Sequence, residues 1–225
     1  MISFLISAIK IIFLLGFLIG IHETGHFLIA KLCKVRVNEF AIGFGPVIWK
    51  KQGKETKYEL RLIPLGGFVN MEGEAEQSEK EGSFTKASIP RRIAIVVAGA
   101  LVNIIFAIIV YFILAMTVRG NLTNAVVGNR VLDADNFENR LYFASYNTKE
   151  FMLSIAESVK QLFTGKVSSA ELVGPVGISE VVAKTNGFRE FIYILSAISI
   201  SLGVTNLLPF PPLDGGKICL LYTSD

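Results

Sequence analysis

Two histidines and a glutamate stand close together near the N-terminus, in the segment His22-Glu23-Thr24-Gly25-His26. They are the only two histidines among the 225 residues of the chain. On a helix, residues four apart lie on one face, one turn apart, so both imidazoles could bind a single metal ion. Glu23 could then take a proton from a metal-bound water. The spacing therefore predicts hydrolysis assisted by a metal ion.

A zinc site that keeps one position open for water usually has three protein ligands, and the chain has no third histidine. We predict Asp214 as the third ligand. It lies in the segment NLLPFPPLDGG, which begins at Asn206 and follows an apolar stretch. An ionisable group at bilayer depth costs on the order of 2.5–3.5 kcal/mol and needs a partner. A cation held by neutral histidines would be such a partner.

Each of these residues also has an ordinary structural explanation. A His-Glu-x-x-His pattern can arise by chance, and a histidine within a membrane can simply bond to a neighbouring helix. Asp214 could be a cap or turn residue. Asparagines within spans commonly join helices by hydrogen bonds, and this explanation applies to Asn103 and Asn206.

The elements that must position these residues are apolar helices. The chain is 52% hydrophobic and only 18% charged, whereas soluble domains have about 25% charged residues. A membrane helix needs about 18 or more predominantly apolar residues. Three stretches meet this criterion: Ser3 to Leu32, Ile93 to Val118, and Phe191 to Leu213, where Pro209, Pro211 and Pro212 must break the last one near its end. A helix resuming at Leu213 would be too short to span the bilayer, so we expect a truncated fourth transmembrane helix.

The loop between the first two stretches contains eleven lysines and arginines, which by the positive-inside rule places it in the cytoplasm and the N-terminus outside. The metal site then lies towards the cytoplasmic face. Within the loop, Tyr58, Leu60 and Leu62 alternate with charged residues and predict a strand that pairs with Val47–Trp49. We expect this strand to end at Pro64. The net charge of +3 is too small and scattered to indicate nucleic-acid binding.

The predicted fold class is therefore an all-α polytopic membrane protein with three transmembrane helices, a truncated fourth and a small cytoplasmic β-element. The segments expected are a first membrane helix (1–33), a cytoplasmic β-loop region (34–92), a second membrane helix (93–118), an extracytoplasmic segment (119–190) and a third membrane helix with the truncated one (191–225). Within the extracytoplasmic segment, an amphipathic helix is indicated by Phe151, Ile155, Val159 and Leu162. Cys33 and Cys219 are expected to be reduced thiols.

Together the motifs resemble the site-2 protease family of intramembrane zinc metalloproteases, specifically the bacterial branch that performs regulated intramembrane proteolysis. The resemblance covers most of the chain in the order of that family. It is carried by Gly20–His26, Tyr58–Glu74, Arg91–Asn103, and Gly174–Ile178 followed by Asn206–Gly216.

The resemblance implies that Zn²⁺ is bound by His22, His26 and Asp214 and that Glu23 is the general base. It also implies that Asn103 and Asn206 hold the substrate or the oxyanion. The loop around Gly66 and Gly67 is similar to the membrane-associated β-loop of the family, which presents an edge to the unwound substrate. The partners implied are the lipid bilayer and a single-span protein substrate, such as an anti-sigma factor or a remnant signal peptide.

Three features depart from the family pattern. The family usually has Gly-Pro where this chain has Gly99-Ala100. The segment 119–190 is too short, and lacks the carboxylate-binding loop, for a complete PDZ domain. A further membrane helix after Asp214-Gly-Gly216 is also missing. Two alternatives therefore stay open: a membrane-anchored zincin with a soluble catalytic site, or a transporter or catalytically inactive homologue.

Overall fold

The computed structural model describes residues 2–74, 76, 78–118, 120–164, 175–185 and 187–223. By its internal contacts the chain divides into two compact units. The first contains Met1–Ile104 and Ser199–Asp225, and the second contains Ile105–Ile198. Gly174, which begins one of the motifs behind the family resemblance, lies outside the described residues.

Within the part of the chain that the structure describes, three helices are long and apolar enough to cross a membrane: α1 (Ile2–Leu32), α2 (Ile89–Met116) and α5 (Phe188–Asn206). They confirm the three expected spans. Many of their large apolar side chains are exposed, and on α2 four of them recur every fourth residue: Leu101, Ile105, Ile109 and Ile113. Such a stripe would be an unusual patch on a soluble protein and is the expected surface of a helix in lipid.

The third apolar stretch is broken near its end, as its prolines predicted. α5 ends at Asn206, and the chain then runs through turns until α6 (Asp214–Thr223) begins. Pro209, Pro211 and Pro212 lack the backbone N–H that a continuing helix would need. α6 has ten residues, about half the length that would span a bilayer, and its identity as a truncated membrane helix stays a prediction.

The small β-element is a pair of long antiparallel strands, β1 (Val37–Gln52) and β2 (Lys57–Met71). Both strands shift register along their length. As a result Glu39–Ile42 of β1 is paired on one side with Gly67–Asn70 and on the other with Lys57–Leu60. Gly67–Met71 pairs with β1 only, so this part of β2 forms an outer edge among the described residues.

The predicted end of the second strand at Pro64 is wrong, because β2 continues to Met71. Pro64 and Leu65 have no partner in the register, which resumes at Gly67 opposite Ile42. Proline is tolerated in a strand at such an irregularity, where its missing N–H interrupts no ladder bond. A side chain at Gly16 of α1 would lie 2.3 Å from the carbonyl oxygen of Pro64, so the strand and the helix touch at backbone distance.

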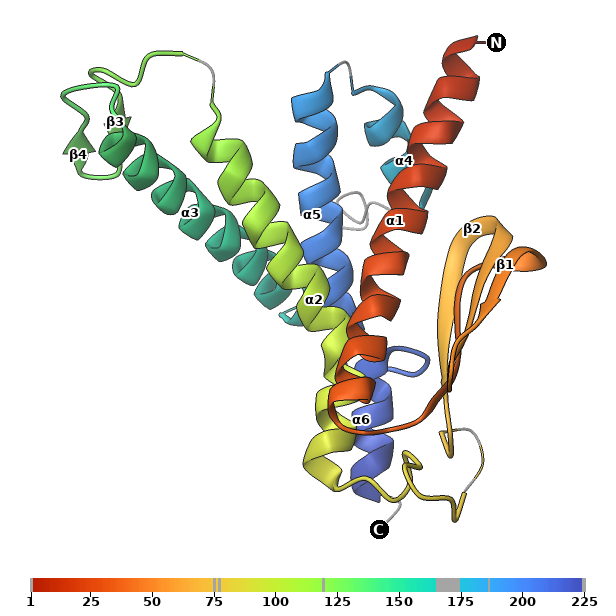
Figure 1. Ribbon diagram of the computed structural model, residues 1–225. Helices are drawn as coiled ribbons and strands as arrows, with labels where there is room; N and C mark the ends of the chain where they lie inside the picture. Colours follow the sequence, from red (N-terminus) through yellow and green to blue (C-terminus); the bar gives the residue numbers. More distant parts are fainter. Residues whose placement is uncertain are drawn as a thin grey trace. The chain divides into compact units, whose positions relative to one another are not determined.

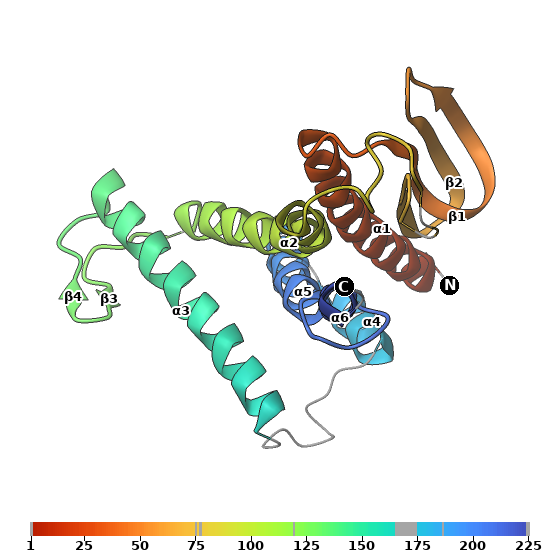
Figure 2. The ribbon, with the colours of Figure 1, turned by 90° about the horizontal axis from the view of Figure 1, so that it is seen from below.

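In Figures 1 and 2 the two strands lie along one side of α1. An apolar core fixes this arrangement where α1 ends and α2 begins. Its members come from both helices, from both strands and from the loop before α2: Ala30, Val35, Val37, Met71, Phe84, Ile95 and Val96. The loop therefore folds back onto the strands and holds the histidine-bearing turns of α1 against the start of α2.

The second unit contains α3 (Phe137–Phe163), α4 (Pro175–Ala183) and a two-residue hairpin of β3 (Val126–Val127) and β4 (Arg130–Val131). α3 contains the residues for which an amphipathic helix was expected, and its amphipathic role stays a prediction. The stacked rings of Tyr111 and Phe151, 4.2 Å apart, join it to α2. The described residues of 119–190 contain no other strands, and the absence of a complete PDZ domain stays a prediction.

Candidate metal centre

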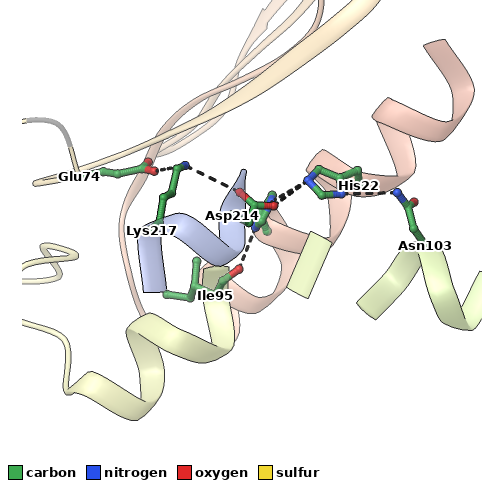
Figure 3. A network of polar contacts seen from close by, with 7 residues as sticks. His22, Glu74, Ile95, Asn103, Asp214 and Lys217 are labelled. Atoms are coloured by element: carbon green, nitrogen blue, oxygen red, sulfur yellow. Dashed lines mark hydrogen bonds and ion pairs between the residues drawn. The ribbon is translucent and has the colours of Figure 1, made fainter. Parts of the chain in front are cut away.

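The two histidines project from the same face of α1. Their Nε2 atoms are 3.2 Å apart, and both residues are 8% exposed. Asp214, the first residue of α6, directs its Oδ2 atom to within 3.0 Å of His22 Nε2 and 3.3 Å of His26 Nε2. Residues nearly two hundred positions apart in the sequence thus meet at one point, as Figure 3 shows for His22 and Asp214.

These three spacings suit a tetrahedral zinc ion. Two ligand atoms about 2.05 Å from zinc, at a tetrahedral angle to each other, lie about 3.3 Å apart. Asp214 Oδ2 is buried and receives no hydrogen bond of acceptable geometry, so a bound cation would satisfy it. Among the described residues, His22, His26 and Asp214 are the one group of three potential ligands close enough to share an ion.

A backbone carbonyl fixes the orientation of His26. Its Nδ1 atom lies 2.8 Å from the oxygen of Ile95 on α2. A carbonyl only accepts hydrogen bonds, so Nδ1 must carry the proton and Nε2 then presents its lone pair to the centre. Metal-binding histidines usually have such a partner on the other ring nitrogen. This contact was not predictable from the sequence, because nothing local links Ile95 to His26.

Asn103 holds His22 in a similar way. Its side chain is fully buried, and the amide nitrogen lies 3.4 Å from His22 Nδ1, whereas the amide oxygen has no partner. The oxygen and nitrogen of an amide have nearly the same shape, so their assignment follows from the hydrogen bonds. Exchanging them lets His22 Nδ1 donate to Oδ1 and leaves Nε2 ready to bind a metal. The substrate-binding role expected for Asn103 stays a prediction.

Two glycines let α1 and α2 cross at this point. A Cβ atom at Gly25 would lie 2.7 Å from the carbonyl oxygen of Ala98, and one at Gly99 would lie 2.4 Å from His26 Nε2. Small residues at such crossings let membrane helices approach closely. Gly99 is thus part of the wall behind the imidazoles. In the sequence, Gly99 stands out only as part of a departure from the family pattern.

Glu23 faces a cavity of about 280 Å³ beside the ligands. Its carboxylate forms no hydrogen bond or ion pair with any described residue, so it is available to exchange a proton. Gly67 of β2 makes room for it, since a Cβ atom there would lie 2.9 Å from Glu23 Cγ. The cavity is lined by His22, Glu23, His26, Gly67, Phe68, Val69, Met71, Glu74, Ile95, Val96, Asp214 and Lys217.

Three of the predicted substrate-binding residues are not among those that line this cavity. Asn103 lies behind His22, to which it is hydrogen-bonded. Gly66 is covered by the ring of Phe44, which a Cβ atom would overlap at 1.8 Å. Asn206 lies at the end of α5, before the turns that lead to Asp214. The structure therefore brings His22, Glu23, His26, Asp214 and Gly67 together at the cavity, places Asn103 behind His22, and leaves Gly66 and Asn206 outside the cavity wall.

Lys217 is a cavity residue that the sequence analysis missed. Its Nζ atom lies 3.2 Å from Glu74 Oε1 and 4.0 Å from Asp214 Oδ1 (Figure 3). Its position could have been predicted from the sequence. Lys217 is three residues after Asp214, and residues three apart on a helix lie on the same face. The contact ties the residues after β2 to α6.

Comparison with known proteins agrees with this geometry. Residues 10–224 match the model of peptidase family M50. The chain is 31% identical to a protein of Clostridium acetobutylicum that is provisionally named a zinc metalloprotease, over 91% of this chain and 83% of the relative. That alignment runs over 281 positions, more than the 225 residues of this chain, so the relative contains residues with no counterpart here.

Two further relatives are named as RseP proteases. The chain is 32% identical to Protease RseP of Yersinia pestis over 85% of this chain and 44% of that protein. It is 42% identical to Regulator of sigma-E protease RseP of Escherichia coli K12 over 118 residues, which are 50% of this chain and 26% of that protein.

Proposed function

The chain belongs to peptidase family M50, and from this membership we propose a zinc-dependent endopeptidase that cleaves membrane-spanning segments of other proteins. The chain is a metallopeptidase of the site-2 protease type, its metal is zinc, and its apolar helices make it a multi-pass membrane protein. One observation supports the proposal that cleavage takes place within membrane-spanning segments. The carboxylate that completes the ligand set follows the third span and meets two histidines inside the first.

We assign His22, His26 and Asp214 as the residues that hold the zinc ion. When bound, zinc polarises a carbonyl group and makes a coordinated water more acidic. Ile95 and Asn103 keep the two imidazoles in the tautomer that leaves Nε2 as the ligand atom.

Glu23 is the proposed general base. Its carboxylate borders the same cavity as the ligands and has no other partner among the described residues. It would accept a proton from the attacking water and return that proton to the nitrogen of the leaving amine. The peptide bond is thereby cleaved with no net change in the protonation of Glu23.

A substrate helix must unwind before hydrolysis, because its peptide groups are engaged in their own hydrogen bonds. The edge of β2 from Gly67 to Met71 supports a proposal for how the unwound segment is held. Phe68, Val69 and Met71 line the cavity, and the edge can add an extended peptide as a further strand. Asn103 and Asn206 are proposed to contribute polar contacts to the same substrate.

The sheet also has an apolar end. Large side chains are exposed on both strands: Phe44, Val47, Ile48, Trp49, Leu62, Ile63 and Leu65. This surface supports the proposal that the β-loop associates with the bilayer. The basic loop after α1 supports an orientation with the N-terminus outside and the metal centre towards the cytoplasm.

The proposed substrates are single-span proteins, such as an anti-sigma factor or a remnant signal peptide after an initial cut outside. The name of the Escherichia coli relative, a regulator of sigma-E protease, is in line with the first of these. In this proposal the segments 1–33, 93–118 and 191–225 supply the membrane helices, 34–92 supplies the β-loop, and 119–190 lies outside the cell.

The test measures zinc content and cleavage of a single-span model substrate by the full chain in detergent. His22→Ala and Asp214→Ala should lose both zinc and cleavage. Glu23→Gln should keep zinc and lose cleavage. Glu157→Gln, on the exposed surface of α3, removes the same charge far from the ligands in sequence and should keep both. Cleavage by Glu23→Gln at the parent rate would rule out the proposed mechanism.

A further inference from the structure

A second cavity, of about 690 Å³, lies where α1 ends and α2 begins. Five basic residues line it, against two acidic ones. Lys31 is in the last turn of α1, Arg91 is in the first turn of α2, and the other residues come from the segments between them. The lining consists of Lys31, Cys33, Lys34, Val35, Arg36, Glu55, Glu81, Gly82, Ser83, Lys86, Ala87 and Arg91.

Only two of the five cations have an anionic partner among the described residues. Lys31 pairs with Glu55 at 3.0 Å, and Lys86 pairs with Glu79 at 3.0 Å. The side chains of Lys34, Arg36 and Arg91 form no hydrogen bond or ion pair within the described part of the chain. The five positive charges around this cavity therefore outnumber its two carboxylates, Glu55 and Glu81, and such a site attracts an anion.

The backbone that carries these cations is held in place. Arg36 donates its backbone N–H to the carbonyl of Gly82 at 2.8 Å, and Val35 donates to Ala30 at 2.9 Å. Below them Val35 and Phe84 belong to the apolar core that joins α1 to α2. The cavity is thus built from segments with fixed positions, so its three cations are brought together before any ligand arrives.

The depth of the cavity points to the class of anion. The last apolar run of α1 ends before Lys31, and α2 becomes apolar after Arg92, so the cavity lies where hydrocarbon gives way to lipid headgroups. Both ends lie at the lower end of Figure 1. Leu28 and Leu32, on the last turns of α1, are 50% and 76% exposed and offer an apolar surface next to the cations. A free phosphate ion would not use that surface, whereas acyl chains would.

We propose that this cavity binds the phosphate of an anionic phospholipid through Lys34, Arg36 and Arg91, with the acyl chains along Leu28 and Leu32. Arginine suits this task because its planar guanidinium can donate two parallel hydrogen bonds to phosphate oxygens. Bound lipid would join the end of the first span to the start of the second. The metal ligands are not part of this site.

The experiment measures binding of short-chain phosphatidylglycerol to the detergent-purified full chain by native mass spectrometry and by thermal stabilisation. The triple variant Lys34→Gln, Arg36→Gln, Arg91→Gln should bind the lipid about tenfold more weakly or less. The matched control Lys50→Gln, Lys51→Gln, Lys54→Gln removes three exposed charges from the strand pair and should change affinity less than about twofold. Phosphatidylcholine should bind weakly to the parent and to both variants.

Zinc content serves as the check that the variants are folded, and the single variant Arg91→Gln, which changes an exposed residue, should bind about threefold more weakly even if the triple variant does not fold. Equal weakening by the two triple variants would reduce the effect to general charge attraction and overturn the proposal. Binding of glycerol 3-phosphate as strong as that of the lipid would overturn the lipid assignment in favour of a free phosphate ester.

Discussion

The two cavities along the last turns of α1 handle charge in opposite ways. At the metal centre, two imidazoles and one carboxylate converge within 3.3 Å of one another, and both histidines are buried. At the basic cavity, the basic side chains outnumber the acidic ones, and Lys34 and Arg91 are exposed. Burial and close convergence select a small fixed cation. Exposure and like charge select a larger ligand that brings its own negative charge.

Neutralising Asp214 should have the largest effect, because it removes the negative charge that distinguishes the metal centre from the basic cavity. Asp214→Asn keeps the shape of the side chain but removes the charge that opposes the metal, so we expect zinc content and cleavage to fall by at least about a hundredfold. Zinc analysis and the single-span cleavage assay measure both effects. The triple variant of the basic cavity should keep zinc at the parent level, and loss of zinc there would show that the two cavities are not independent.

A side chain at Gly99 should have the next largest effect. Its Cβ atom would lie 2.4 Å from His26 Nε2. The imidazole cannot move away without pulling Nε2 from the metal or breaking the hydrogen bond from Nδ1 to Ile95. We expect Gly99→Ala to weaken zinc binding at least about tenfold, measured by competition with a chelator. Gly187→Ala is the matched control, because a Cβ atom there meets nothing within 4 Å. An unchanged zinc affinity in Gly99→Ala would contradict the helix crossing described here.

Asn103 offers a finer test of how the ligands are held. Asn103→Leu removes the acceptor for His22 Nδ1 and should weaken zinc binding about 10- to 100-fold. Asn103→Asp keeps an acceptor oxygen and should restore most of that affinity. If the residue only contacts substrate, Asn103→Leu will raise KM or lower kcat and leave the dissociation constant for zinc unchanged.

The sequence was sufficient for the parts of the metal centre that follow from spacing and composition. The histidines share a face because helices have a period of 3.6 residues, and the spans follow from apolar length. The approach of Asp214 was predicted because a carboxylate beside a span needs a partner. The partner atoms behind the ligands were not predictable, since the carbonyl of Ile95 and the space at Gly99 are set by how α1 and α2 cross.

The β-element shows the same limit. Alternation predicted the strand at Tyr58, yet Pro64 suggested an end that the chain does not have. The tendency of proline to end a strand is outweighed here by tertiary packing. The backbone at Pro64 lies against Gly16 of α1, and the strand resumes beyond the irregularity. Its continuation carries Gly67 to the metal centre. Only the three-dimensional arrangement distinguishes Gly67, at the cavity, from Gly66, which is covered by Phe44.

The smallest expected effect concerns the loop that forms one wall of the basic cavity. Glu72 accepts hydrogen bonds from Ser78 at 2.7 Å and Asn38 at 3.1 Å and pairs with Lys80 at 3.2 Å. These contacts lower the pKa of its carboxyl from an ordinary value of 4.5 to about 2. The stabilisation they give is therefore fully present above pH 4.5 and is lost as the pH falls from there through about 2.

Glu72→Gln should lower the midpoint of thermal unfolding by roughly 2 °C at pH 6, and the difference from the parent should shrink as the pH falls towards 3. Glu76→Gln, an exposed carboxylate in the same loop, should show no such dependence. The wall contributes none of the three cations proposed to bind the phosphate, because its lining residues are Glu81, Gly82, Ser83, Lys86 and Ala87. Affinity for phosphatidylglycerol should therefore change by less than about twofold. A tenfold loss in Glu72→Gln would mean that the loop, rather than the three cations, forms the lipid site.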